Sequence, residues 1–499
     1  MITVHLLEWA RMLKPADMFD RDREWAQLKG FIEDDRAGAT LGVVSGRRRQ
    51  GKSFLLEAAC QQADGFYFSA QEATEAESLS LIGMALTRYL NPVAPITPAD
   101  WPTVIDILLQ LGRDRTVPVA IDEFPYLARV SPALPSMIQA AYAPRRAERS
   151  GSRTRLLLCG SALSFMGKLL SGNAPLRGRA SLDLTVQTLD YRLAAQFWGL
   201  QDPRLAFLVH AVVGGTPAYR TEMIRFDAPG DLADFDVWVT RAVLSPGSPM
   251  FLEARYLLAE EPELRDMALY HSVLAAIAAG NTGRGGIAGH VGRKSNELSH
   301  PLTVLEDAGL IVRENDAFRA NRTDFRINEP LLTFYHAIMR PFWPQLMRGT
   351  SAGQVWERSQ HRFASSILGP HFERICREWA LYFAGDRFGD WPVQVAAGTV
   401  NDPRNKTLHQ IDVAVLGHAD GARPPLLAIG EAKWNEQMGM GHLERLRRIR
   451  DLLTGSKRFD TSRTRLACFS AAGFTDDLKR ARRGDVDLIS LEDLYDGAS

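Results

Sequence analysis

Residues 46–53, Gly-Arg-Arg-Arg-Gln-Gly-Lys-Ser, combine residue types and a spacing that suit a chain of phosphates. Gly46 and Gly51 allow the backbone to wrap closely and to turn its N–H groups towards phosphate oxygens. Lys52 can reach the β- and γ-phosphates of a nucleotide, and the hydroxyl of Ser53 can ligate Mg²⁺. The pattern G-x-x-x-x-G-K-S therefore predicts a P-loop that binds ATP. The predicted nucleotide contacts are Gly46, Arg47, Arg48, Arg49, Gln50, Gly51, Lys52 and Ser53.

The segments on either side of this loop supply the context that a P-loop needs. Leu41–Val44 is apolar and predicts a buried strand, and the residues from Lys52 to Leu56 predict the start of a helix. The positive N-terminal end of that helix would face the same phosphates. A chance match inside a structural loop is the alternative, and the flanking strand and helix argue against it.

The acid pair Asp122-Glu123 follows the apolar strand Val117–Ile121. In P-loop enzymes such a pair supplies a carboxylate associated with Mg²⁺ and a base that orients the attacking water. We expect Asp122, together with Ser53, in the metal role and Glu123 in the role of the base. A strand that ends in two acids is common by itself. About seventy residues after a complete P-loop, it favours an ATPase.

A second set of candidate groups, Asp412, Glu431 and Lys433, lies in the last third of the chain. Glu431 and Lys433 are two residues apart on a predicted strand, so they should project from the same face. Asp412 on the preceding strand can point to the same spot. Two carboxylates can hold Mg²⁺, while the lysine positions or activates water for attack on a phosphodiester. The alternative is a chance cluster, because D-x18-E-x-K is a loose pattern.

Composition bounds the class of protein. The 499 residues predict about three domains, and 45% hydrophobic residues are enough for several buried cores. The formal net charge is zero, so any nucleic-acid site must be a local basic patch. The four cysteines form no C-x-x-C pair, which argues against zinc and suits a reducing cytosol. The sequence shows no signal peptide and no apolar run long enough to span a membrane, so we expect a cytoplasmic protein without a membrane partner.

The predicted strands and helices determine where these candidate site residues lie. Apolar strands alternate with helices up to about residue 190, which predicts a parallel sheet covered on both faces. One of the strands ends at Ser161, which could touch the γ-phosphate or serve as a helix N-cap. The pattern is helical from 191 to about 255, with a Gly/Pro break at 213–219 that fits the first turn of a new helix.

Residues 271–315 predict three helices and a strand hairpin, the order of a winged helix-turn-helix. Such folds bind DNA through the third helix. Here that helix offers only Arg293, Lys294 and His300 near its start, and acids follow. Because the basic stripe is thin, a simple connector is the alternative to a DNA reader.

Several of these motifs together resemble a known family. F-D-R-x-x-E at Phe19–Glu24, followed by G-R-R-R-x-G-K-S, is similar to predicted archaeal and bacterial P-loop ATPases of the AAA+/STAND superfamily. The break at 213–219 resembles the family's nucleotide-sensing lid motif, and Arg326–Pro330 resembles its R-I-x-[DE]-P box. Leu176–Arg179 resembles its L-x-G-R box. This implies that Arg179 can stabilise phosphoryl-transfer charge in the same subunit or from a neighbour in a homo-oligomer.

The C-terminal residues resemble the PD-(D/E)xK nucleases. This resemblance implies a restriction-endonuclease-like α/β domain that acts on DNA, with Glu373 as a further Mg²⁺ ligand beside Asp412 and Glu431. Ile411 stands where the motif usually has proline, a change that the chemistry tolerates because proline is not a ligand. The arginines of the predicted helix at 440–453 offer a local basic surface for phosphates.

The sequence thus predicts an α/β protein in four parts. They are a P-loop NTPase parallel sheet at 1–190, a helical lid at 191–255, a winged helix at 256–345, and a restriction-endonuclease-like domain at 346–499. The first hypothesis is an ATP-hydrolysing switch coupled to a Mg²⁺-dependent nuclease-like module acting on DNA. The alternative is a nucleotide-gated regulator whose inactive nuclease fold contacts DNA or protein.

Overall fold

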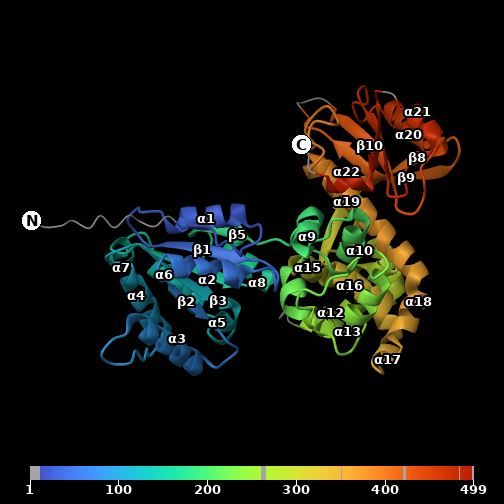
Figure 1. Cartoon of the computed structure of the whole chain (residues 1–499). Helices are drawn as coiled ribbons and strands as arrows, with labels where there is room; N and C mark the ends of the chain where they lie inside the picture. The colour runs from blue at the N-terminus through green and yellow to red at the C-terminus, as the bar shows by residue number, and fades with distance from the viewer. Residues whose placement is uncertain are drawn as a thin grey trace, which may run out of the picture. The chain divides into compact units, whose positions relative to one another are not determined.

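The computed structural model describes residues 12–172, 174–259, 266–349, 351–419, 423–482 and 484–496. The chain forms two compact units that divide between Thr188 and Leu189, and each has a five-stranded sheet of its own (Figure 1). Among the described residues, no helix combines the length and the apolar character that crossing a membrane requires. The finer division of the second unit, at 255 and 345, stays a prediction.

The first unit contains a five-stranded parallel sheet in the order β2-β3-β4-β1-β5. Its strands are β1 (Thr40–Ser45), β2 (Phe66–Ser69), β3 (Val117–Asp122), β4 (Thr154–Gly160) and β5 (Ala180–Thr185). Its helices are α1 (Asp22–Ile32), α2 (Lys52–Gln62), α3 (Glu75–Leu90), α4 (Trp101–Leu111), α5 (Phe124–Val130), α6 (Leu134–Ala141), α7 (Ala147–Ser150) and α8 (Leu163–Leu170). The predicted parallel sheet is confirmed. Because β4 lies between β1 and β3, the carboxyl ends of these three strands meet at one edge of the sheet.

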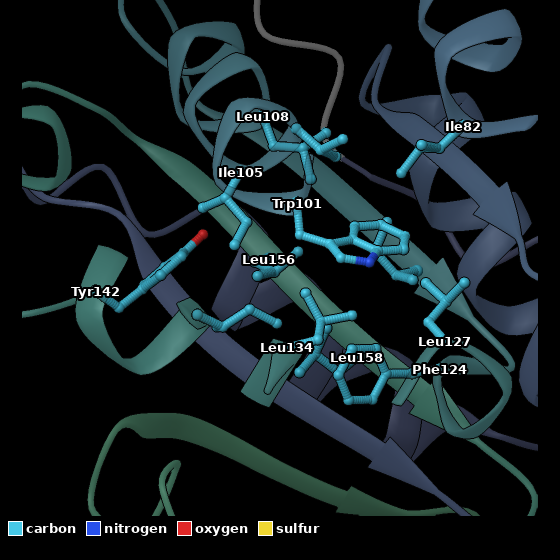
Figure 2. A pocket seen from close by; sticks show the side chains of 13 residues that line it. Ile82, Trp101, Ile105, Leu108, Phe124, Leu127, Leu134, Tyr142, Leu156 and Leu158 are labelled. Atoms are coloured by element: carbon cyan, nitrogen blue, oxygen red, sulfur yellow. The ribbon is translucent and has the colours of Figure 1, made fainter. Parts of the chain in front are cut away.

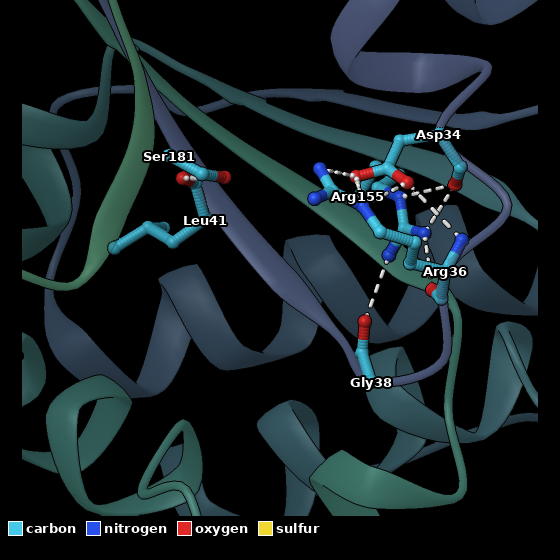
Figure 3. A network of polar contacts seen from close by, with 6 residues as sticks. All are labelled: Asp34, Arg36, Gly38, Leu41, Arg155 and Ser181. Carbon is cyan, nitrogen blue, oxygen red and sulfur yellow. Dashed lines mark hydrogen bonds and ion pairs between the residues drawn. The ribbon is translucent and has the colours of Figure 1, made fainter.

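A buried arginine joins the sheet to the connection between α1 and β1 (Figure 3). Arg155 on β4 is fully buried, and its guanidinium donates to the carbonyl oxygens of Asp34, Arg36 at 2.8 Å and Gly38 at 2.9 Å. A buried guanidinium needs acceptors for its N–H groups, and these carbonyls supply them. Arg155 therefore fixes the path by which the chain enters the central strand β1.

The apolar core of the first unit encloses a small cavity of about 20 Å³ around Trp101 (Figure 2). Its walls are the aliphatic and aromatic side chains of several helices and of β3 and β4. A space of this size is close to that of one water molecule, and its lining is almost entirely apolar. The cavity belongs to core packing and offers no ligand site.

The second unit begins with helices. They are α9 (Tyr191–Trp198), α10 (Pro203–Val213), η1 (Tyr219–Met223), α11 (Phe235–Trp238), η2 (Val239–Val243) and α12 (Pro249–Ala259). Three further helical segments and a hairpin follow. They are α13 (Met267–Ala278), α14 (Arg284–Val291), η3 (Ser295–Leu298) with α15 (Ser299–Asp307), and the antiparallel pair β6 (Ile311–Asn315) and β7 (Thr323–Ile327). The element order predicted for 271–315 is present, although the third helix is split. Pro301 lies in the first turn of α15, where proline is tolerated, and it could not occupy the interior of one longer helix.

A helical segment connects this hairpin to the C-terminal sheet. It consists of α16 (Pro330–Phe334), η4 (Tyr335–Met339), η5 (Arg340–Phe342), α17 (Trp343–Leu346), α18 (Ala352–Arg362), η6 (Phe363–Leu368) and α19 (Gly369–Tyr382).

The C-terminal sheet is mixed, with the order β12-β11-β10-β9-β8. Its elements are β8 (Gln394–Asp402), β9 (Thr407–Leu416), β10 (Leu426–Lys433), α20 (Met440–Ser456), β11 (Arg465–Ser470), α21 (Asp476–Arg480), β12 (Val486–Ser490) and α22 (Leu491–Tyr495). Consecutive residues of β10 belong to different apolar clusters: Ala428 packs in the cluster that contains Phe372 of α19, and Ile429 packs in the cluster that contains Leu443 of α20. Because neighbouring strand residues point to opposite faces, α19 and α20 cover the two faces of this sheet.

Candidate functional site

The predicted P-loop occupies the turn between β1 and α2, at the edge where β3 and β4 also end. Gly46 has φ 149°, and a Cβ atom there would lie 2.5 Å from the carbonyl oxygen of Val186. Gly51 has φ 88°. Only glycine fits these two positions without strain, so both ends of the loop depend on glycine for their backbone geometry.

Lys52 lies inside this loop. Its side chain is buried, and its Nζ donates to the carbonyl oxygen of Arg47 at 2.8 Å. Burial lowers the pKa of Lys52, and the charges of Glu123 and Asp122 oppose that shift. The ammonium group therefore lies close to the predicted acid pair.

Asp122, at the end of β3, is buried and accepts several hydrogen bonds. The hydroxyl of Tyr67 donates to its Oδ2 at 2.8 Å, and the backbone N–H of Glu123 donates to its Oδ1 at 2.9 Å. Burial alone would raise the pKa of Asp122, but hydrogen bonds from Cys159, Ser53 and Tyr67 bring the pKa below its ordinary value. The carboxylate is thus ionised beside the Ser53 hydroxyl. Hydroxyl and carboxylate oxygens are ligands that Mg²⁺ accepts, so this pair fits the metal that the fold implies.

Glu123 is held by the end of β4. The hydroxyl of Ser161 lies 3.1 Å from both Oε1 and Oε2 of Glu123. Arg48 of the loop donates from Nε to Ser161 Oγ at 3.3 Å and from Nη2 to the hydroxyl of Tyr126 at 2.8 Å. Ser161 is not the N-cap of α8, because that position belongs to Ala162. The sequence predicted Arg48 and Glu123 as site residues. It did not predict the hydrogen bonds through Ser161 that join them.

Two other predicted features of the first unit can be placed. Arg21, from the F-D-R-x-x-E motif, donates to the carbonyl oxygen of Gln50 at 3.2 Å, so this motif borders the loop. Arg179 directly precedes β5, whose first residue Ala180 pairs with Leu41 at the start of β1. Arg179 therefore lies at the edge of the sheet opposite to the loop. This placement does not support action of Arg179 on a nucleotide of its own subunit.

In the second unit, Glu431 and Lys433 project together from the end of β10, with Lys433 Nζ 2.9 Å from Glu431 Oε1. Arg445 of α20 donates from Nη1 to the same oxygen at 2.7 Å. The antiparallel register of β9 and β10 continues to Asp412 beside Glu431. Sequence reasoning placed Arg445 on a basic surface and missed its contact with Glu431.

The carboxylate of Asp412 is buried and engaged in hydrogen bonds. Its Oδ2 accepts from the backbone N–H of Ala432 at 2.9 Å, and its Oδ1 accepts from Gln410 Nε2 at 3.3 Å. Burial raises the pKa of Asp412; the N–H of Ala432 and the charge of Lys433 oppose the shift, and the charge of Glu431 adds to it. The predicted trio of Asp412, Glu431 and Lys433 therefore shares one electrostatic environment.

Glu373 reaches this environment from α19. Its Oε2 lies 4.0 Å from Nη1 of Arg377. Burial, and then the charge of Asp412, raise the pKa of Glu373 to about 7 against the opposing charges of Arg377 and Lys433. The predicted additional acid is thus close enough to Asp412 to feel its charge.

The predicted metal site of three carboxylates stays a prediction. Within the described parts of the chain, no group of three or more His, Cys, Asp or Glu side chains converges closely enough to hold a metal ion. Lys433 and Arg445 hold Glu431 at a cleft of about 580 Å³, whereas Glu373 lines a different cavity of about 720 Å³. Lys433 and Arg445 both contact Oε1 of Glu431, so a metal ion would compete with two cations for that oxygen.

The predicted basic surface on α20 is largely neutralised. Arg445 is paired with Glu431, Arg448 Nε donates to Asp402 at 3.0 Å, and Arg450 Nη1 lies 2.8 Å from Asp485. These ion pairs anchor α20 to the sheet. They leave less positive charge for phosphates than the sequence suggested.

The fold and site of the first unit define a class of protein. A parallel sheet in this order, with G-x-x-x-x-G-K-S joining its central part to a helix, is typical of P-loop NTPases. No protein-family model matches the chain, and no curated protein matches its sequence.

Solved structures that resemble the chain include the following three. A Walker-type ATPase of Pyrococcus abyssi is 20% identical, over 64% of this chain and 96% of that one, with a TM-score of 0.49. The ORC2 protein of Aeropyrum pernix is 14% identical over 71% and 98% of the two chains, with a TM-score of 0.38. Cdc6p of Pyrobaculum aerophilum is 15% identical over 68% and 98%, with a TM-score of 0.34. At these identities and TM-scores, the function of the chain rests on its own residues.

Proposed function

We propose that the first unit is a Mg²⁺-dependent ATPase of the AAA+ class. The observation that carries this proposal is the buried Asp122 carboxylate, which lies at the end of β3 on the same sheet edge as the loop that buries Lys52. A cation, a hydroxyl and a carboxylate at the end of parallel strands are what the phosphates of a nucleotide and their Mg²⁺ require.

In this proposal each residue has a defined task. The N–H groups of the loop and the Lys52 ammonium hold the phosphates, and Ser53 and Asp122 hold Mg²⁺. Mg²⁺, when bound, neutralises charge on the transferring phosphoryl group. Glu123 accepts a hydrogen bond from water and orients it for attack on the γ-phosphate. Tyr67 keeps the Asp122 carboxylate in place through its 2.8 Å hydrogen bond.

For the second unit we propose a winged helix at 256–345, preceded by a lid at 191–255, and a nuclease-like module at 346–499 that acts on DNA. The 2.9 Å contact of Lys433 with Glu431, with Asp412 on the adjacent strand, supports a nuclease-like site. In it Lys433 would position water beside a phosphodiester. Arg179, placed away from its own loop, could act only on a neighbouring subunit of a homo-oligomer.

One observation favours a second candidate function. Arg445 binds the Glu431 oxygen that a metal would need, at 2.7 Å. This contact supports a nucleotide-gated regulator, in which the nuclease-like sheet contacts DNA or protein without cutting. The two candidates share the ATPase and differ only in the chemistry of the second unit.

The full chain should be assayed with Mg²⁺ for ATP hydrolysis, and for cutting of plasmid and single-stranded DNA with and without ATP. We expect hydrolysis that Lys52→Ala abolishes, because the phosphate charge is then uncompensated. If the module cuts DNA, Asp412→Ala and Lys433→Ala should each stop cutting and leave hydrolysis intact. Absence of ATP binding by the wild-type chain would overturn the ATPase, and DNA binding without cutting would select the regulator.

A further inference from the structure

Arg48 belongs to the phosphate loop and is linked through one hydroxyl to Glu123. Its Nε donates to Ser161 Oγ at 3.3 Å, and that hydroxyl is 3.1 Å from both carboxylate oxygens of Glu123. Its Nη2 donates to the hydroxyl of Tyr126 at 2.8 Å. A cation placed among the phosphate contacts is thus connected to the carboxylate that would orient water.

The hydroxyl of Ser161 forms hydrogen bonds with both Arg48 and Glu123. It has one proton, which the two oxygens of Glu123 share, and its own oxygen accepts from a charged donor. A charged donor polarises a hydroxyl and strengthens the hydrogen bond that the hydroxyl donates. The backbone of Glu123 has a left-handed conformation, with φ 51°, and its carbonyl oxygen accepts from Tyr126 N–H at 3.0 Å. The position of the carboxylate therefore depends on Ser161, and through Ser161 on Arg48.

The location of the guanidinium suits a phosphate. The charges of both Arg48 and Glu123 act on Lys52, whose ammonium reaches the β- and γ-phosphates in a P-loop. Ser161 and Tyr126 offer Arg48 neutral hydroxyl oxygens. A phosphate carries negative charge and these hydroxyls do not, so it attracts the guanidinium more strongly, and a guanidinium can bind phosphate with two parallel bonds.

We propose that Arg48 senses the γ-phosphate and controls Glu123 through Ser161. A nucleoside triphosphate draws the guanidinium from Tyr126 and Ser161 onto its γ-phosphate, and Glu123 is then free to accept a hydrogen bond from the attacking water. A diphosphate leaves Arg48 where it is, so Glu123 stays held. Arg48 is in this role a positioning residue that also distinguishes triphosphate from diphosphate, and the inference rests on the proposed ATPase function.

The test is calorimetric titration of the full chain with Mg²⁺-ADP and with a non-hydrolysable Mg²⁺-ATP analogue. Arg48→Ala should weaken binding of the triphosphate roughly tenfold or more and leave ADP binding unchanged. Arg48→Lys should restore part of this preference, because it keeps the charge. Tyr126→Phe should have the opposite effect and tighten triphosphate binding, because the guanidinium loses a competing acceptor. Arg88→Ala, at an exposed arginine of α3, is the matched control.

Each outcome separates the proposals. If Arg48→Ala keeps the wild-type preference for triphosphate, Arg48 is no sensor, and the ATPase proposal is unaffected. Equal losses for both nucleotides would mark a structural role and also overturn the inference. If the wild-type chain binds neither nucleotide, the proposed function itself fails. Steady-state hydrolysis adds a second readout, in which KM should rise in Arg48→Ala and recover in Arg48→Lys.

Discussion

Arg445 Nη1 lies 2.7 Å from Glu431 Oε1, the same oxygen that Lys433 Nζ approaches at 2.9 Å. Two cations on one carboxylate oxygen satisfy the charge that a divalent ion would otherwise neutralise. A metal ion at Glu431 would therefore compete with both cations for this oxygen. Movement of α20 or removal of Arg445 would relieve part of that competition.

Arg445→Ala should increase the affinity of the second unit for Mn²⁺ or Mg²⁺ roughly tenfold, because one repelling charge next to Glu431 disappears. Calorimetric titration without nucleotide measures this. The double variant Arg445→Ala/Glu431→Ala should lose the gain, and Arg447→Ala on the same helix should leave affinity unchanged. Unaltered metal binding in Arg445→Ala would favour the regulator over the nuclease.

Glu123→Gln should bind ATP with nearly wild-type affinity and hydrolyse it about a hundredfold or more slowly, since the amide cannot act as a base. Asp122 and Ser53 remain to hold Mg²⁺ in this variant. Single-turnover hydrolysis beside equilibrium binding separates the two effects, and Lys52→Ala, which should lose binding, is the comparison. Wild-type turnover in Glu123→Gln would assign the base to another residue.

Arg155→Met should lower the free energy of unfolding by about 3 kcal/mol or more, because the carbonyls of Asp34, Arg36 and Gly38 lose a charged donor in a buried place. The thermal unfolding of the first unit would report this. Arg153→Met, which removes a single bond to the carbonyl of Asp114, should have a much smaller effect. Equal decreases in the free energy of unfolding in the two variants would contradict the role given to the burial of Arg155.

The buried pair His210 and His371 should make the second unit less stable as the pH drops below about 6.5, while the raised pKa of Glu373 acts in the opposite direction over the same range. His210 Nδ1 lies 3.0 Å from His371 Nε2, and burial holds the pKa of both well below its ordinary value of 6.5. Below that pH the unfolded chain binds protons that the folded chain does not, so the free energy of unfolding decreases by up to about 1.4 kcal/mol per pH unit for each histidine. Above pH 6.5 the effect vanishes.

Melting temperatures between pH 7.5 and 5 would reveal this slope. His371→Gln should remove the contribution of the pair to this slope, whereas His300→Gln, at an exposed position, should leave the slope unchanged. The same slope in the wild type and in His371→Gln would rule out the effect of the buried pair.

Neutralising Arg293 and Lys294 should weaken DNA binding modestly and reduce the log–log salt slope by about one for each phosphate that is no longer bound. The effect should be smaller for Arg293, whose Nη1 lies 3.7 Å from Glu297. Fluorescence anisotropy at several salt concentrations would measure it, with Arg88→Gln as control. An unchanged slope would leave residues 271–315 as a connector.

The sequence by itself determined the elements and the site parts whose signals are local. Helix α3 has such signals, because Thr74 caps its start by accepting from Glu77 N–H and Asn91 ends it in a left-handed conformation. The P-loop could be predicted because its signal is also local: the glycines, the lysine and the serine of the pattern all lie within residues 46–53. Strand β5 was missed because half of its side chains are exposed, so it is defined by pairing with β1 and not by an apolar run.

Only the tertiary structure decided which distant groups meet. Arg48 and Ser161 are 113 residues apart, and His210 and His371 are 161 apart, yet each pair shares a hydrogen bond. The sequence predicted that Arg445 contributes to a basic surface. In the structure α20 packs against the sheet, and Arg445 forms a hydrogen bond with Glu431. Sequence patterns specify residue types and local periodicity, whereas strand order and helix packing select each buried charge's partner. The turn between β1 and α2 could therefore be predicted, and the contact of Arg445 with Glu431 could not.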